Sequence, residues 1–166
     1  MGVLNQVTME QQRNEKWCWA AVTSSVFRAL KQTPISQAQV VCQVLNNPNC
    51  RLEPTPDECN KVFLLDVALQ EVCECNVNVV ENTLDFADLQ NQVDSQSRPV
   101  PITLRFNGGV FHYCLIKGCN DAGGLQEVIL LDPAHLNGGE THIPYADLCD
   151  GAVLGGATWV QSFVIQ

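Results

Sequence analysis

The order of hydrophobic and polar positions divides the chain into a helical first part and a strand-rich second part. Residues 18–31 carry apolar side chains at near-helical spacing, which are Trp19, Val22, Val26 and Leu30. This spacing predicts a helix over 18–31. We expect it to end before Thr33-Pro34, because proline cannot continue a helix and disfavours helical geometry in the residue before it.

Three more helices are predicted in the first part. Ser36 and Gln39 have the spacing of a capping box, so a short helix is expected through residues 40–45. Thr55-Pro56-Asp57-Glu58 is a stronger start signal, with a threonine cap and a proline at the first helical position. The inward face of that third helix would hold Val62, Leu65, Leu69 and Val72. A fourth helix is expected over 83–96.

Strand and turn signals dominate from residue 98 onward. A short strand is predicted at 77–80, followed by strands at 99–106, 110–119, 125–131 and 157–165. Asn107-Gly108-Gly109 and residues 120–124 have turn composition. Residues 134–156 are predicted to form a long glycine-rich loop with one helical turn near 145–149.

These elements predict an α+β fold in which an N-terminal helical part packs on a C-terminal antiparallel β-sheet. The length of 166 residues favours one domain. No repeat, low-complexity segment or linker argues for two. We therefore predict a single domain over 1–166, with a helical part of about 1–96, a β part of about 97–166, and a seam between them.

Composition and charge exclude several classes of partner. The chain is 46% hydrophobic and 16% charged, which is enough to bury a core, and its net charge is -9. Its nine lysines and arginines are scattered, so nucleic-acid binding and adhesion to an anionic membrane are disfavoured. No apolar run approaches the roughly 20 residues of a membrane span, so no membrane insertion is expected. Nothing in the sequence indicates the oligomeric state.

The compartment stays open at this point. The first residues lack the basic start and apolar stretch of a signal peptide, which fits either a cytoplasmic protein or a secreted or delivered effector. There are nine cysteines. If one is a free nucleophile, the other eight are either paired in as many as four disulfides, as in an oxidising compartment, or are reduced core residues.

Cys18 is the candidate nucleophile. It lies between Trp17 and Trp19 where a polar segment becomes the first helix. The unpaired N–H groups of a helix start favour a thiolate, and such placement can lower a cysteine pKa from about 8.5 to roughly 3.5–7.5. The two tryptophans are interpreted as packing residues, or, for Trp17, as part of a substrate-binding cleft.

His112 and Asp132 are the candidate base and its orienter. The chain has three histidines, and His112 lies inside the apolar strand 110–119. If strands 110–119 and 125–132 pair, Asp132 returns toward His112 and can fix the imidazole tautomer. The alternative is an ordinary hydrogen-bonded core histidine. His135 and His142 are expected to be solvated loop residues.

Gln12 is a candidate donor to a developing oxyanion. It precedes Cys18 by six residues, so its side-chain amide could act together with the backbone N–H of Cys18. Gln11 is the adjacent competitor for this role.

A zinc site is the weaker interpretation of the same region. His112 and Cys114 share one face of the predicted strand, and Cys119 follows in the same strand. Zinc sites usually carry Cys-x₂₋₄-Cys spacing, and no second matched pair is present. No metal and no cofactor are therefore expected.

The order Gln12, Cys18, His112, Asp132 resembles that of the papain-like cysteine peptidases. Trp17-Cys18-Trp19-Ala20-Ala21 is similar to the bacterial group that includes the AvrRpt2-type effector peptidases, and the match continues in order through Thr158-Trp159. A more distant resemblance is to the double-glycine leader peptidases of bacteriocin exporters. The resemblance implies a papain-like fold and a thiol peptidase acting on a peptide or protein.

The resemblance also implies a role for each candidate residue. Cys18 would be the nucleophile, His112 the general base, Asp132 the orienter and Gln12 part of the oxyanion hole. Cys42, Cys50 and Cys59 fall where relatives carry cysteines, which suggests a structural framework. Two alternatives stay open: a catalytically silent peptide-binding module with a protease-like cleft, and a transamidase that uses the same acyl-enzyme.

Overall fold

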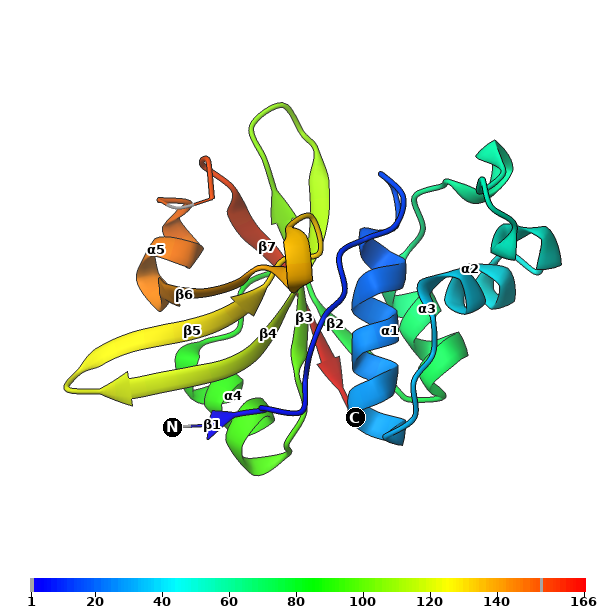
Figure 1. Cartoon of the computed structure of the whole chain (residues 1–166). Helices are drawn as coiled ribbons and strands as arrows, with labels where there is room; N and C mark the ends of the chain where they lie inside the picture. Colours follow the sequence, from blue (N-terminus) through cyan, green and yellow to red (C-terminus); the bar gives the residue numbers. More distant parts are fainter. Residues whose placement is uncertain (1, 153) are drawn as a thin grey trace.

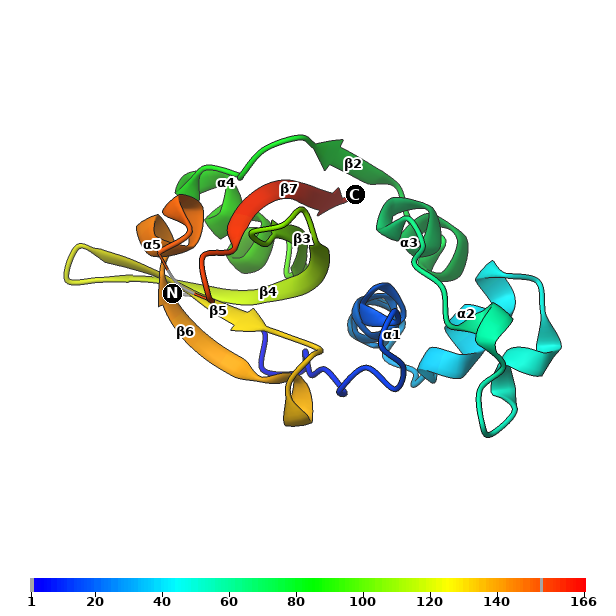
Figure 2. The same ribbon diagram turned by 90° about the horizontal axis from the view of Figure 1, so that it is seen from above.

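The computed structural model describes residues 2–152 and 154–166 and confirms the α+β prediction. Helix α1 (Cys18–Lys31) lies between the sheet and the helices α2 (Gln37–Val44) and α3 (Leu65–Cys73). Figures 1 and 2 show α1 side by side with the sheet on one flank and with α2 and α3 on the other. The seam between the two parts therefore runs along α1.

The sheet is antiparallel at every described pairing. Its strand order is β2 (Val77–Val80), β7 (Thr158–Ile165), β3 (Val100–Arg105), β4 (Phe111–Ala122), β5 (Leu125–Leu131) and β6 (Glu140–Pro144). A short β1 (Gly2–Val3), which the sequence did not predict, pairs with β4. The short helices α4 (Phe86–Gln90) and α5 (Tyr145–Asp150) belong to the sheet side of the molecule (Figure 1).

The helix signals succeed where they depend on local contacts. The predicted capping box forms, with the Ser36 hydroxyl accepting from the Gln39 N–H at 3.2 Å. The third helix was predicted wrongly at its start, because residues 57–59 form only a 3₁₀ turn and α3 begins at Leu65. Val62 is 76% exposed instead of inward. Two tertiary contacts hold the intervening segment outside the helix: a Cys50–Cys59 disulfide and a hydrogen bond from the Trp19 indole to the Lys61 carbonyl.

The second part contains an element that the sequence reading missed. The predicted loop 134–156 holds strand β6 and helix α5, and its residue 153 lies outside the described residues. Three of the five residues of β6 are exposed and polar, so it has no hydrophobic alternation to signal a strand. It forms because it pairs with β5. The predicted helix 83–96 is α4 followed by a π turn over 91–95.

The register of the β4–β5 hairpin determines which residue of β4 lies opposite Asp132. Its turn is Gly123-Gly124, with φ of +71° and +80°, a conformation that favours glycine. The register pairs Leu115 with Leu131. Asp132, the next residue, therefore leaves the sheet level with Cys114 on β4.

An N-terminal segment joins the two parts. It pairs with β4 at its beginning and then crosses the sheet to reach α1, as Figure 1 shows. The Gln12 N–H donates to the Pro133 carbonyl at 2.8 Å. Gly138 lies so close that a Cβ there would clash with the Met9 carbonyl oxygen. The segment before Cys18 is thus fixed against the loop that follows Asp132.

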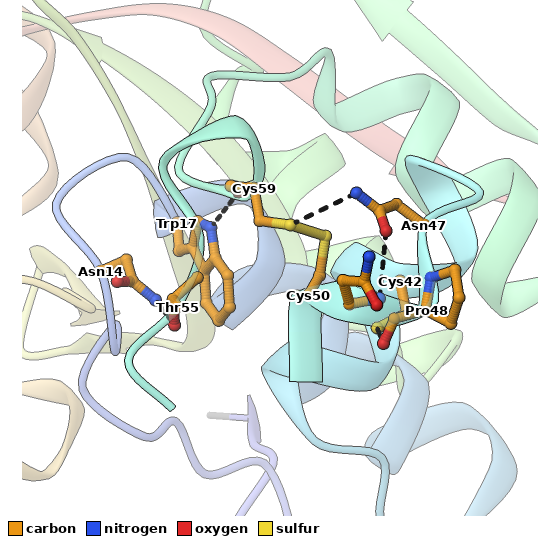
Figure 3. Close-up of a disulfide and its surroundings, with 9 residues drawn as sticks. Asn14, Trp17, Cys42, Asn47, Pro48, Cys50, Thr55 and Cys59 are labelled. Atoms are coloured by element: carbon orange, nitrogen blue, oxygen red, sulfur yellow. Dashed lines mark hydrogen bonds between the residues drawn. A yellow bond between two sulfur atoms is a disulfide. The ribbon is translucent and has the colours of Figure 1, made fainter. Parts of the chain in front are cut away.

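One disulfide forms among the described cysteines, between Cys50 and Cys59 (Figure 3). The other described cysteines are free thiols: Cys18, Cys42, Cys73, Cys75, Cys114, Cys119 and Cys149. The number of disulfides therefore lies between the two alternatives expected from the sequence, four disulfides or none. No helix within residues 2–152 and 154–166 is long and apolar enough to cross a membrane.

Candidate active site

Cys18 is the first residue of α1 and is partly exposed. A turn precedes it, closed by the Trp17 N–H donating to the Asn14 carbonyl at 3.1 Å. In this fully described stretch, the N-cap residue Trp17 makes no side-chain capping bond. The first N–H groups of α1 are thus not occupied by a cap, and such groups attract negative charge.

The tryptophans beside Cys18 anchor the helix start to residues 59–61. The Trp17 indole donates to the Cys59 carbonyl at 2.8 Å, and the Trp19 indole donates to the Lys61 carbonyl at 2.9 Å. Figure 3 shows the Trp17 ring beside the disulfide. Trp17 is only 1% exposed, so the structure puts it in the core, as in the packing interpretation. Sequence reasoning missed the acceptor loop, since nothing local marks these carbonyls.

His112 and Asp132 meet through the strand register. The His112 Nε2 and Asp132 Oδ1 atoms are 2.7 Å apart, and the two side chains are 14% and 10% exposed. The carboxylate also accepts from the Ala134 N–H at 2.8 Å, and His135 Nδ1 lies 3.1 Å from its other oxygen. His135 therefore contacts this pair, although the sequence suggested a purely solvated residue. His142 instead lies 2.9 Å from Glu127.

The imidazole is in contact with thiols as well as with the carboxylate. The thiols of Cys18 and Cys114 lie close enough to His112 to favour its protonated form, and the ligand atoms of His112 and Cys114 are within 4.8 Å of each other. Burial alone would lower the pKa of His112, but the bond to Asp132 and the two thiol contacts raise that pKa to about 12. Burial would raise the pKa of Asp132, but the bond to His112 holds it below its usual value. Both directions favour an imidazolium beside a carboxylate at neutral pH.

The structure separates the residues of the sequence-based zinc interpretation. Cys119 lies opposite Val128 and 3.9 Å from Asp94, further along β4. The group of potential ligands found in the described residues consists of His112, Cys114 and Asp132. Cys114 and His112 lie close to each other, as the sequence predicted. The third potential ligand beside them is Asp132, whereas the sequence had suggested Cys119.

A pocket of about 760 Å³ opens at Cys18. Exposed apolar side chains from both halves of the molecule form much of its wall, namely Val62, Leu64, Val110 and Phe111. The pocket lining also includes three polar side chains joined by hydrogen bonds, Thr103, Gln161 and Glu81. There, Thr103 Oγ1 donates to Gln161 Oε1 at 2.9 Å, and Gln161 Nε2 donates to Glu81 at 3.0 Å. The pocket can hold an apolar side chain next to the thiol.

Gln12 lies beside the same seam, in contact with the loop after Asp132. Its side-chain Nε2 donates to the carbonyls of Asn14 and Glu15, at 3.0 and 2.7 Å. Its Oε1 is buried with no hydrogen-bond partner among the described residues. In this conformation the amide supports the turn before Cys18, and donation to a ligand would require one of those bonds to be released.

The fold and this site define a cysteine-type peptidase of the papain-like class. The chain belongs to the family described as papain-like cysteine protease AvrRpt2, which matches residues 3–141. The family confirms the resemblance found in the sequence. The protease activity of this family implies that the substrates are peptides or proteins.

Solved structures of low identity share the fold. One comes from a study of antibody cross-reactivity between the mite allergens Blo t 1 and Der p 1, with 15% identity and a TM-score of 0.59 over 98% of this chain and 69% of that one. Another is digestive procathepsin L 3 of Tenebrio molitor larval midgut, with 12% identity and a TM-score of 0.54 over 96% and 66%. No curated protein matches the chain.

Proposed function

We propose that this protein hydrolyses peptide bonds through a Cys18–His112–Asp132 triad and an acyl-enzyme intermediate. The observation that carries the proposal is the chain of contacts from Asp132 through His112 to Cys18, which ends at an open pocket. Asp132 binds Nε2 of the imidazole, which leaves Nδ1 as the ring nitrogen that can serve the thiol. This is the arrangement of nucleophile, base and orienter that acyl transfer needs.

The first half-reaction forms a thioester. The Cys18 thiolate attacks the scissile carbonyl carbon, and the carbonyl oxygen becomes an oxyanion. The Cys18 backbone N–H, at the uncapped start of α1, and the Gln12 amide are the proposed donors to that oxyanion. The His112 imidazolium then gives its proton to the leaving amine, and the C–N bond breaks.

The second half-reaction consumes water. His112, now neutral, accepts a proton from a water molecule that attacks the thioester carbonyl. The C–S bond breaks, the acid product leaves, and the thiolate–imidazolium pair is restored. The mixed apolar lining of the pocket supports a peptide substrate with an apolar side chain close to the scissile bond.

The test combines labelling with product analysis. Iodoacetamide or an epoxysuccinyl inhibitor should modify Cys18 fastest among the free thiols, and His112→Ala should slow this labelling. A peptide library should be cleaved by the wild type and left intact by Cys18→Ala. Uniform slow labelling of several thiols without cleavage would indicate a silent binding module, and amide products in the presence of an added amine would indicate a transamidase.

A further inference from the structure

A second thiol lies beside the imidazole, and the peptidase chemistry does not use it. Cys114 follows His112 by two residues on β4, so both side chains lie on the same face of the sheet. Cys114 is fully buried and contacts the imidazole. Because Leu131 pairs with Leu115, Asp132 comes level with Cys114 on the neighbouring strand. Strand pairing thus gathers a nitrogen, a sulfur and an oxygen donor.

The three donors have the spacing of an incipient tetrahedral site. Their ligand atoms all lie within 4.8 Å of one another. Tetrahedral zinc with bonds of about 2.0–2.3 Å holds its ligand atoms about 3.3–3.6 Å apart. The 2.7 Å contact between His112 and Asp132 would need to open by about 0.6 Å, and a separation at the 4.8 Å limit would need to close by about 1.3 Å. Side-chain rotation can supply shifts of that size.

The surroundings suit a bound cation. The Ala134 N–H donates to the Asp132 carboxylate and His135 contacts its other oxygen. Such additional partners commonly orient the carboxylates that bind metals. Water has little access, because Cys114 is 0% exposed and the other two side chains are nearly buried. The pocket reaches Cys18, next to the imidazole, which is the side from which an ion would approach. A water molecule is then available as the fourth ligand, because Cys18 lies at the other ring nitrogen of His112.

We propose that His112, Cys114 and Asp132 form a binding site for Zn²⁺, through which this ion reversibly inhibits the metal-free peptidase. Zinc replaces the hydrogen-bonded proton between imidazole and carboxylate, and the Cys114 thiol loses its proton to solvent on binding. The two negative ligands neutralise the ion. The imidazole can then neither accept nor donate a proton, so turnover stops. This consequence rests on the proposed function, whereas the binding itself does not.

Cobalt absorption tests the binding without any peptidase activity. Co²⁺ is added to Cys18→Ala, and thiolate-to-cobalt charge-transfer absorption is recorded in the near ultraviolet. We expect the band in Cys18→Ala, its loss in Cys18→Ala/Cys114→Val, and its retention in Cys18→Ala/Cys149→Ala, where the altered thiol lies on α5. A band that survives the Cys114 change, or that is absent from Cys18→Ala, overturns the proposal. Circular dichroism checks the fold, and Cys114→Ser repeats the comparison if the valine variant does not fold.

Zinc inhibition tests the consequence. Each protein is assayed against its own rate in the presence of a chelator, so any basal effect of the substitution cancels. The zinc concentration for half inhibition should rise at least about tenfold in Cys114→Val, and a chelator should restore the wild-type rate. Equal inhibition of both proteins means that zinc acts on Cys18 and His112 alone and overturns the site. An absence of cleavage by metal-free wild type contradicts the proposed function and leaves the cobalt result standing.

Discussion

The two halves of the molecule position their site residues by different physical means. In the helical half, Cys18 is held by the short turn before α1 and by two indole hydrogen bonds to residues 59–61. In the sheet half, His112 and Asp132 are brought together by the register of β4 and β5 across 20 residues of chain. The nucleophile therefore depends on side-chain anchors to a loop, and the base depends on backbone pairing. Substitutions can test each means separately.

The largest effect is expected where the two halves meet. His112→Ala should remove nearly all turnover, as should Cys18→Ala, because neither side chain can act without the other. The double variant should fall no further than either single one, since residues that act as a unit are strongly non-additive. Rates from peptide cleavage give all three values. His142→Ala is the control, because that exposed histidine pairs with Glu127 away from the site and should keep its activity.

Further loss in the double variant would contradict this prediction. It would mean that the two halves contribute to the reaction independently.

Removal of the orienter should have a smaller effect. Asp132→Ala should lower kcat by on the order of 10³–10⁴-fold, less than loss of the nucleophile or base. The pH profile should change too. In the wild type the bond to Asp132 helps to raise the pKa of His112 to about 12, so the imidazolium persists well above neutral pH. Without Asp132 that pKa falls, and the alkaline limb of kcat/KM should move to lower pH.

An unchanged alkaline limb in Asp132→Ala would contradict this prediction, because it would mean that Asp132 does not control the pKa of the His112 imidazole. Asp132→Asn sharpens the test, because the amide can still hold Nε2 but carries no charge. It should restore part of the rate and leave the limb shifted.

The same division explains what the sequence could reveal. Residue order and the hairpin turn predicted that Asp132 returns toward His112, because a short turn sets antiparallel register to within a residue or two. The sequence did not reveal the irregularity between Ile116 and Gly118 that shifts this register. The helix start at Cys18 was also visible as a change of period. The sequence did not reveal that residues 59–61 anchor this helix start, since Cys59 and Lys61 act through backbone carbonyls that any residue carries. β6 was missed because its exposed edge carries polar side chains, and its pairing with β5 is a long-range effect.

Gln12 connects the halves, and its loss should have the next smaller effect. Gln12→Ala should lower kcat by on the order of 10²–10³-fold, the usual cost of one oxyanion donor. Gln11→Ala is the matched control, since its amide lies at 3.4 Å from the Ala134 carbonyl on the exposed side. Steady-state kinetics distinguish the role: an oxyanion donor changes kcat with little change in KM. A rise in KM alone would assign Gln12 only to the turn before Cys18, where its amide bonds lie in this structure.

The smallest effect on the reaction is expected from the disulfide, because it acts on the anchor loop and not on the triad. Cys50→Ser opens a bridge between residues nine apart. A loop of that size stabilises the folded chain by about 2–3 kcal/mol in the chain-entropy model. Denaturant unfolding should show that loss, while the remaining folded molecules keep most of their turnover because both indole bonds to residues 59–61 are still possible. Cys149→Ala, a free thiol of the sheet half, is the control and should be affected less. A large fall in turnover by folded Cys50→Ser would mean that the indole anchors hold Cys18 only when the bridge holds their acceptors, and the nucleophile would then depend on long-range contacts as much as the base does.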